Sequence, residues 1–267
     1  MSSTVAALPI TLGKELDFNL DEASAFGRQL TATYTAAGPF PHVVIDNFLP
    51  ADVIDSIHAN FPAERTNDEK LYERGYKGLH KRQINPNRCN PTLRNIFSAF
   101  NSAAMLQFLE NLTTIDGLIP DPYFDGGGLH ETKTGGLLGV HADFRINKKL
   151  HLVRRINVII YLNKNWQEEY GGNLELWDQK MTACLKRVSP VYNRCVIFNT
   201  DEDSNHGHPE PLRTPEHITR RSVALYYYTS SRNIYGEIER DKTHYKPRPR
   251  DRLSVRYYLD KWTRKKG

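Results

Sequence analysis

Two histidines and one aspartate have the spacing of a metal site. His141 and Asp143 lie one residue apart in the segment GGLLGVHAD, and His206 follows in the segment SNHGHP. In an extended strand, residues i and i+2 point to the same face, so this imidazole and this carboxylate converge on one point. A second strand that brings His206 to the same point completes a set of two histidines and one carboxylate. Such a set binds Fe(II) on one face and leaves coordination positions open.

The glycines before His141 strengthen this prediction, because a His-x-Asp pair alone is a weak signal. Gly135, Gly136 and Gly139 indicate an irregular strand to which another backbone segment comes close. Two histidines and a carboxylate around an open Fe(II) centre are typical of non-haem oxygenases. We therefore expect O2 chemistry at this point of the chain.

An oxygenase of this kind also needs a source of electrons, and 2-oxoglutarate needs a cation for its distal carboxylate. Arginine suits this task because its planar guanidinium binds a carboxylate through two hydrogen bonds. The segment RRSVALYYYT offers Arg220 and Arg221. Strand alternation puts Arg220 on one face with Ser222, Ala224 and Tyr226, and puts Arg221 on the other face. We favour Arg220, with Ser222 beside it, as the ligand of 2-oxoglutarate, while Arg221 stays open as the alternative.

Asn157 and Tyr161 are the polar residues on one face of the predicted strand Ile156–Leu162. Buried asparagine and tyrosine side chains need hydrogen-bond partners. These two side chains would bond either to each other or to the carboxylates of 2-oxoglutarate, and we favour the cosubstrate.

The elements that must position these residues change in character near Pro120. Before it, apolar residues at helical spacing predict helices at Asp21–Ala36, Ala51–Asn60 and Thr92–Thr114, with a strand in Pro39–Leu49. After it, short runs separated by Gly, Asn and Pro predict strands at Gly128–Thr132, Leu137–Asp143, Ile156–Leu162, Asn173–Trp177, Lys186–Val188, Arg194–Asn199 and Ser222–Thr229. Such a series indicates a sandwich or barrel. The polar segment Glu64–Pro91 is interpreted either as a loop that covers the substrate or as a solvated irregular segment.

The composition is that of a globular protein, with 39% hydrophobic and 10% aromatic residues, so a sizeable core can form. No run approaches about 18 apolar residues, and the first residues lack the features of a secretory signal, so we predict neither a membrane span nor secretion. The cysteines, Cys89, Cys184 and Cys195, are odd in number and far apart. They indicate reduced thiols in the cytoplasm rather than disulfides or a zinc site.

Five segments, in order, resemble those of the Fe(II)/2-oxoglutarate dioxygenases of the prolyl-hydroxylase-like bacterial branch. They are DPYFDGGGLHETKTGGLLGVHADF, RRINVIIYLNKNW, EEYGGNLELWD, RCVIFNTDEDSNHGHPEPL and RRSVALYYYT, and FPHVVIDNFLPADV upstream resembles the usual lead-in. The resemblance covers about Pro39–Thr229. It implies a mainly β fold with flanking helices (α+β): a double-stranded β-helix, or cupin-like jelly roll, with an N-terminal helical layer.

The resemblance also implies roles for individual residues. The metal triad of the family corresponds to His141, Asp143 and His206. The tyrosine that the family carries on a barrel strand corresponds to Tyr161, and the arginine that binds the cosubstrate corresponds to Arg220 or Arg221. His208 follows the motif histidine and is interpreted as a residue that supports the ligand set or lies on the surface.

One position departs from the family pattern. Many prolyl hydroxylases carry a tyrosine about ten residues before the first metal histidine, where this chain has His130, Glu131 and Thr132. Because the carboxylate Asp143 is present, hydroxylation is favoured over halogenation.

We divide the chain into a lead-in at 1–37, a dioxygenase domain at 38–236, which contains the resemblance, and a basic extension at 237–267 that we expect to pack on the domain through its aromatic residues. The net charge of +5 mildly favours anionic partners, but we disfavour the extension as a nucleic-acid-binding arm.

We therefore expect an enzyme that uses Fe(II), 2-oxoglutarate and O2 to hydroxylate an unactivated C–H bond, releasing succinate and CO2. Its substrate is either a free amino acid or small natural product, or a peptidyl residue such as proline. The alternatives are a non-catalytic cupin-type binding module and a basic nucleic-acid-binding protein. Neither alternative explains why two strands carry metal-binding histidines next to an arginine that can bind a carboxylate.

Overall fold

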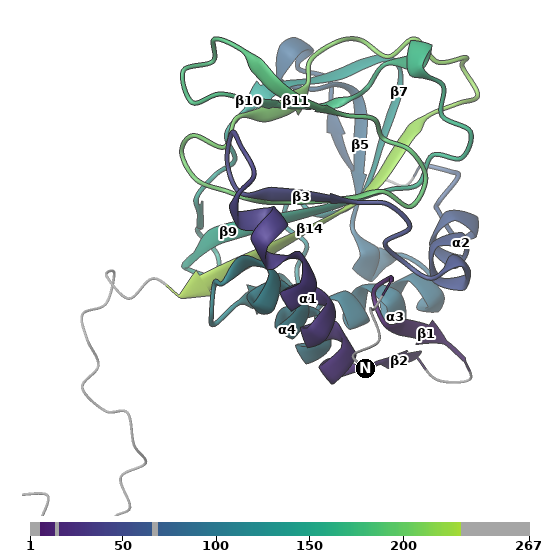
Figure 1. Ribbon diagram of the computed structural model, residues 1–267. Coiled ribbons are helices and arrows are strands. Elements are labelled where there is room, and N and C mark those ends of the chain that lie inside the picture. The colour runs from purple at the N-terminus through teal and green to yellow at the C-terminus, as the bar shows by residue number, and fades with distance from the viewer. Residues whose placement is uncertain (1–5, 14–15, 66–68, 231–267) are drawn as a thin grey trace, which may run out of the picture. The chain divides into compact units, whose positions relative to one another are not determined.

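Antiparallel strands dominate the computed structural model, which describes residues 6–13, 16–65 and 69–230 (Figure 1). Within these residues, one sheet contains twelve strands: β3 (His42–Ile45), β4 (Lys70–Tyr72), β5 (Leu79–Ile84), β6 (Ile119–Pro120), β7 (Gly128–His141), β8 (Ile146–Asn147), β9 (Leu152–Tyr161), β10 (Leu174–Trp177), β11 (Cys184–Val188), β12 (Cys195–Asn199), β13 (His206–His208) and β14 (Arg220–Ser230). Strands β1 (Ile10–Leu12) and β2 (Leu16–Phe18) form a separate ribbon.

Strand β7 takes part in two layers. Its first half pairs with β5 and β14 and belongs to a layer with the order β5-β7-β14-β9-β12-β3, which we call the major sheet. Its second half pairs with β13 and belongs to the layer β11-β10-β13-β7, the minor sheet. The two layers face each other (Figure 1), and this arrangement confirms the predicted double-stranded β-helix.

Helices cover the outer face of the major sheet, as predicted for the N-terminal part (Figure 1). They are α1 (Leu20–Thr35), α2 (Ala51–Ala59), α3 (Pro91–Phe100) and α4 (Ala103–Thr113). The side chain of Asn19 caps α1 by accepting from Glu22 N, and Asn90 caps α3 by accepting from Leu93 N. These caps satisfy backbone N–H groups that have no partner within a helix. They explain where the helices begin.

Two predicted segments differ from the structure. The single helix expected at Thr92–Thr114 is divided into α3 and α4 by Asn101 and Ser102, because Ser102 has the extended backbone of a residue that precedes a helix. The segment Glu64–Pro91 is not one irregular loop. It contributes β4 and β5, and β5 extends the major sheet by pairing with β7.

Other sequence features can be compared with the described residues directly. The three cysteines are free thiols. None of the helices in the described ranges has both the length and the apolar character needed to cross a bilayer. The predicted basic extension at 237–267 and residues 231–236 of the predicted domain lie outside the described residues.

The packing of α4 against α1 and against the turn after β3 provides a stability test. Phe108 of α4 is fully buried, and its ring lies 5.4 Å from that of Phe26 and 5.8 Å from that of Phe48. Phe108→Ala should lower the free energy of unfolding by about 3–5 kcal/mol, because it removes buried apolar surface and leaves a cavity. Leu20→Ala, at an exposed position of α1, should change it by no more than about 0.5 kcal/mol. Equal effects of the two variants in denaturant unfolding would contradict this packing.

Candidate active site

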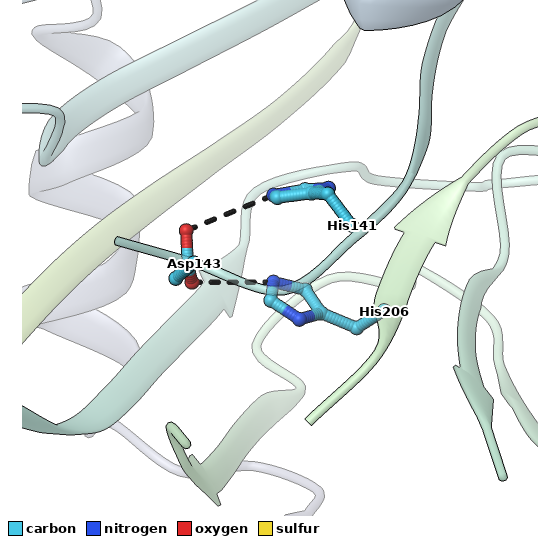
Figure 2. A group of neighbouring side chains, drawn as sticks. All are labelled: His141, Asp143 and His206. Atoms are coloured by element: carbon cyan, nitrogen blue, oxygen red, sulfur yellow. Dashed lines mark ion pairs between the residues drawn. The ribbon is translucent and has the colours of Figure 1, made fainter. Parts of the chain in front are cut away.

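His141, Asp143 and His206 converge between the two sheets (Figure 2). Their ligand atoms all lie within 4.8 Å of one another. His141 Nε2 is 3.7 Å from Asp143 Oδ1, and His206 Nε2 is 3.4 Å from Asp143 Oδ2. The convergence follows from the strand register, because His141 of β7 is paired directly with His206 of β13. The structure therefore brings together all three residues predicted as metal ligands.

Hydrogen bonds to the backbone orient both imidazoles of this triad. His141 Nδ1 donates to Gly139 O at 2.9 Å, and His206 Nδ1 donates to Ser204 O at 2.8 Å. Each ring therefore presents its Nε2 lone pair toward Asp143, which is the arrangement that orients histidine ligands at metal sites. Burial lowers the pKa of His206 to about 4, so this ring is neutral and able to bind a metal at neutral pH. The donor set fits Fe(II).

Arg154 and Asn157 of β9 hold the carboxylate of Asp143. Asn157 Nδ2 donates to Asp143 Oδ2 at 2.7 Å, and Arg154 Nη2 lies 2.9 Å from the same oxygen. Arg154 also donates to Asn157 Oδ1 through Nε and Nη2. Burial alone would raise the pKa of Asp143, but Arg154 and the two histidines outweigh this effect and hold the pKa well below its usual range. Asp143 is therefore ionised and fixed in position.

Arg154 was not predicted as a site residue. Simple alternation along β9 places Arg155, not Arg154, on the face of Asn157. The ladder between β9 and β14 contains a bulge, since Tyr227 pairs with Ile156 and Tyr228 pairs with Arg154. The extra residue reverses the alternation and turns Arg154 inward. The structure also separates Asn157 from Tyr161, which donates no hydrogen bond to it but meets Arg220 instead.

The hydrogen bond from Asn157 to Asp143 should strengthen metal binding. Asn157→Ala is expected to weaken Mn(II) or Fe(II) binding by about 10–100-fold, because partners of metal ligands contribute effects of this size. Asn147→Ala is the matched control, since Asn147 is buried nearby on β8 but accepts from the backbone of Lys149 and Leu150. A metal titration by calorimetry compares them. Equal metal affinity of Asn157→Ala and the wild type would show that this contact does not position Asp143.

Arg220 lies inside the barrel and Arg221 lies on the opposite face of β14. Arg220 is 6% exposed, its Nε donates to Gly172 O at 2.8 Å, and its Nη2 donates to Tyr161 Oη at 3.3 Å. Arg221 Nε donates to Glu131 Oε1 at 2.8 Å, outside the barrel cavity. The side chains thus follow the predicted alternation. The binding of 2-oxoglutarate by Arg220, Ser222 and Tyr161 stays a prediction.

A cavity of about 80 Å³ connects the triad with Arg220. A single water molecule needs roughly 10–15 Å³ by the same measure, so the cavity accommodates a larger ligand. Its lining contains Ser222 and three basic residues: Lys81 and His130, which sequence reasoning did not assign to the site, and His208, which it interpreted as a support of the ligand set or a surface residue. His208 is buried rather than on the surface. Lys81 was not predicted because it lies in the polar segment before the barrel. Both faces of that segment carry polar residues, so alternation does not show which side chains point into the barrel.

Comparisons with known proteins agree with this geometry. Residues 127–228 match the model of the 2OG-Fe(II) oxygenase superfamily. The chain is similar to prolyl 3-hydroxylase OGFOD1 of Mus musculus, with 26% identity over 214 residues, which are 78% of this chain and 35% of the mouse protein. The chain therefore spans about a third of the length of this curated relative.

Two solved structures share the fold. The prolyl hydroxylase of Trichoplax adhaerens has a TM-score of 0.53 at 16% identity, covering 78% of this chain and 91% of the other. The prolyl-4-hydroxylase of Pseudomonas putida has a TM-score of 0.51 at 20% identity, covering 75% of this chain and 99% of the other. Residues 127–228 are therefore similar to the 2OG-Fe(II) oxygenase superfamily, and the fold is the one that these prolyl hydroxylases share. The match indicates Fe(II), 2-oxoglutarate and O2 as cofactor and cosubstrates, and the donor set of the triad fits Fe(II).

Proposed function

We propose that this chain hydroxylates a prolyl residue, or a chemically similar C–H group, in an Fe(II)- and 2-oxoglutarate-dependent reaction. One observation carries this function: His141, Asp143 and His206 present three metal-ligand atoms within 4.8 Å in a cavity that Arg220 also lines. A metal site and a buried guanidinium in one cavity match the two ends of 2-oxoglutarate.

The residues of the chain would divide the work as follows. His141, Asp143 and His206 hold the metal, and Arg154 and Asn157 keep the carboxylate of Asp143 in place. Fe(II) held there would supply O2 activation with 2-oxoglutarate as the electron source, so that one oxygen atom of O2 would enter succinate, with loss of CO2, and the other would enter the hydroxylated product. The walls of the barrel exclude water from this centre and aim the substrate at it. No side chain has to act as a general base in this scheme.

The distal carboxylate of 2-oxoglutarate would bind at Arg220. Tyr161 Oη and Ser222, on the same face of the major sheet, offer further polar groups there. A guanidinium binds a carboxylate more specifically than an ammonium does, because its N–H groups are fixed in a plane.

The prolyl preference rests on the mouse relative, which is described as a prolyl 3-hydroxylase, and on the surface beside the triad. Phe144 follows Asp143 directly and is 44% exposed. Tyr76 is 59% exposed, and its Oη accepts from Val140 N at 3.1 Å. Exposed aromatic rings next to the metal site suit an apolar ring such as that of proline. We also infer a cytoplasmic location, since the three cysteines are free thiols.

The test is a screen for succinate release with Fe(II), 2-oxoglutarate and three sets of substrates. These are peptides with proline, matched peptides with alanine in its place, and free amino acids with small natural products. Proline-dependent succinate release, with a product that has gained one oxygen atom, is the expected result. Release with the third set alone would assign a small-molecule substrate. Binding of 2-oxoglutarate without turnover of any set would favour a non-catalytic binding module.

A further inference from the structure

Lys81 lies in line with Arg220 on the inner face of the major sheet. Strand β5 pairs Lys81 with Thr132 of β7, and β14 pairs Arg220 with the same Thr132 from the other side. Residues that are directly paired across strands point to the same face. Both basic side chains line the cavity. Lys81 lies outside residues 127–228, which match the superfamily model.

The surroundings of Lys81 fix its ammonium group. Lys81 is 7% exposed, and its Nζ donates to His130 Nδ1 at 2.5 Å. His130 Nε2 donates to Gly126 O at 3.0 Å, so Nδ1 is the acceptor nitrogen of this ring. The Nζ atom also lies 4.5 Å from the ring centroid of Tyr72. Lys81 is thus held in one position inside the barrel.

Neither of these buried basic side chains has an acidic partner. Across residues 6–13, 16–65 and 69–230, no carboxylate forms an ion pair with Lys81 or Arg220. Buried charges in proteins are normally paired. Arg220 already donates through Nε to Gly172 O and through one Nη2 hydrogen to Tyr161 Oη. The Nε/Nη2 side of the guanidinium is therefore occupied, and a carboxylate would have to bind at the side formed by the two Nη groups.

A third basic side chain of the same cavity lacks a partner. His208 is 3% exposed, and neither of its ring nitrogens has a hydrogen-bond partner in the part of the chain that the structure describes. A buried polar group without a partner normally indicates a ligand or water.

We propose that Lys81 is a second cationic ligand for the distal carboxylate of 2-oxoglutarate, opposite Arg220. This inference rests on the proposed function and adds a residue to its cosubstrate site. The carboxylate would accept hydrogen bonds from Arg220 through its free Nη groups and from Lys81 through Nζ. It would supply a negative charge beside two buried basic side chains that have no acidic partner, while His208 offers another hydrogen bond.

Binding of a carboxylate should change the protonation of Lys81. Burial, with a further effect from Arg220 and Lys70, lowers the pKa of Lys81 to about 7 in the ligand-free protein. The titratable groups around Lys81 are Lys70, Tyr72, His130, Asp143, His208 and Arg220. Above pH 7 Lys81 is therefore mostly neutral without ligand, and a bound carboxylate raises its pKa again. Binding at pH 8 should take up a proton.

The experiment compares the wild type with Lys81→Met by calorimetry, using protein loaded with Mn(II) in place of Fe(II). Two ligands are titrated at pH 8: 2-oxoglutarate and 2-oxovalerate, which has the same chain length without the distal carboxylate. We expect Lys81→Met to weaken 2-oxoglutarate binding by about 10–100-fold, as for a lost hydrogen bond to a charged group, and to leave 2-oxovalerate binding unchanged. Proton uptake, measured in buffers of different ionisation enthalpy, should accompany 2-oxoglutarate binding only in the wild type.

Lys133→Met is the matched control, because Lys133 is an exposed lysine of β7, next to Thr132, and should not affect either ligand. If Lys81→Met does not fold, Lys81→Gln takes its place. Unchanged 2-oxoglutarate binding by the folded variant would overturn the inference, as would equal losses for both ligands. If the wild type binds Mn(II) but not 2-oxoglutarate, the proposed function itself fails.

Discussion

Alanine in place of His141, Asp143 or His206 is expected to abolish Fe(II)-dependent turnover. Each substitution removes one of three ligand atoms that lie within 4.8 Å of one another. Among the described residues, no other group of histidine, cysteine, aspartate or glutamate side chains forms a metal site of this kind, so no second site can hold the metal in place of this one. Succinate formation measures turnover, and calorimetric titration with Mn(II) measures the loss of metal affinity separately.

A histidine outside the cavity provides the control for these variants. His217 is exposed on the segment before β14, and His217→Ala should retain both metal binding and turnover. Asp143→Ala leaves Arg154 buried without its carboxylate partner, so thermal unfolding must show that this variant is folded. Normal turnover rates for all three triad variants would refute the assignment of the metal site.

The triad was predictable from sequence because it depends on local geometry. His141 and Asp143 need only the period of a strand, and His206 lies in a recognisable segment between strands. Arg154 was not predictable, since a bulge in β9 reverses the direction of its side chain relative to Asn157. A bulge is set by the pairing with β14, and such pairing between distant segments has no local signal.

The fold was likewise predictable where its signal is local and not where it depends on pairing between distant strands. The change from helical to strand periodicity near Pro120 predicted the helical layer and the barrel. The segment Glu64–Pro91 carried no clear period, because Arg82 of β5 is buried outside the cavity by pairing with Glu131 at 2.6 Å while Lys81 points inward. Because charged residues lie on both faces of β5, its sequence lacks the alternation of polar and apolar residues that predicts a strand. The strand is defined by its pairing with β7.

The second large effect is expected for 2-oxoglutarate binding. Arg220→Ala should raise the 2-oxoglutarate concentration needed for turnover by orders of magnitude, while metal binding survives. The physical reason is that the distal carboxylate would stay buried without its guanidinium, at a cost of about 3–5 kcal/mol. Titration of 2-oxoglutarate, with succinate as the readout, measures this effect, and a Mn(II) titration verifies the intact metal site.

Arg221→Ala is the matched control on the other face of the same strand. Arg221 Nε donates to Glu131 Oε1 at 2.8 Å and to Thr219 Oγ1 at 3.0 Å, and its side chain is 28% exposed. Its loss should lower the free energy of unfolding by only about 1 kcal/mol, since Glu131 keeps its bond to Arg82. A large loss of 2-oxoglutarate affinity in Arg221→Ala, but not in Arg220→Ala, would contradict the strand register. Normal affinity in both variants would mean that 2-oxoglutarate binds elsewhere or is not the cosubstrate.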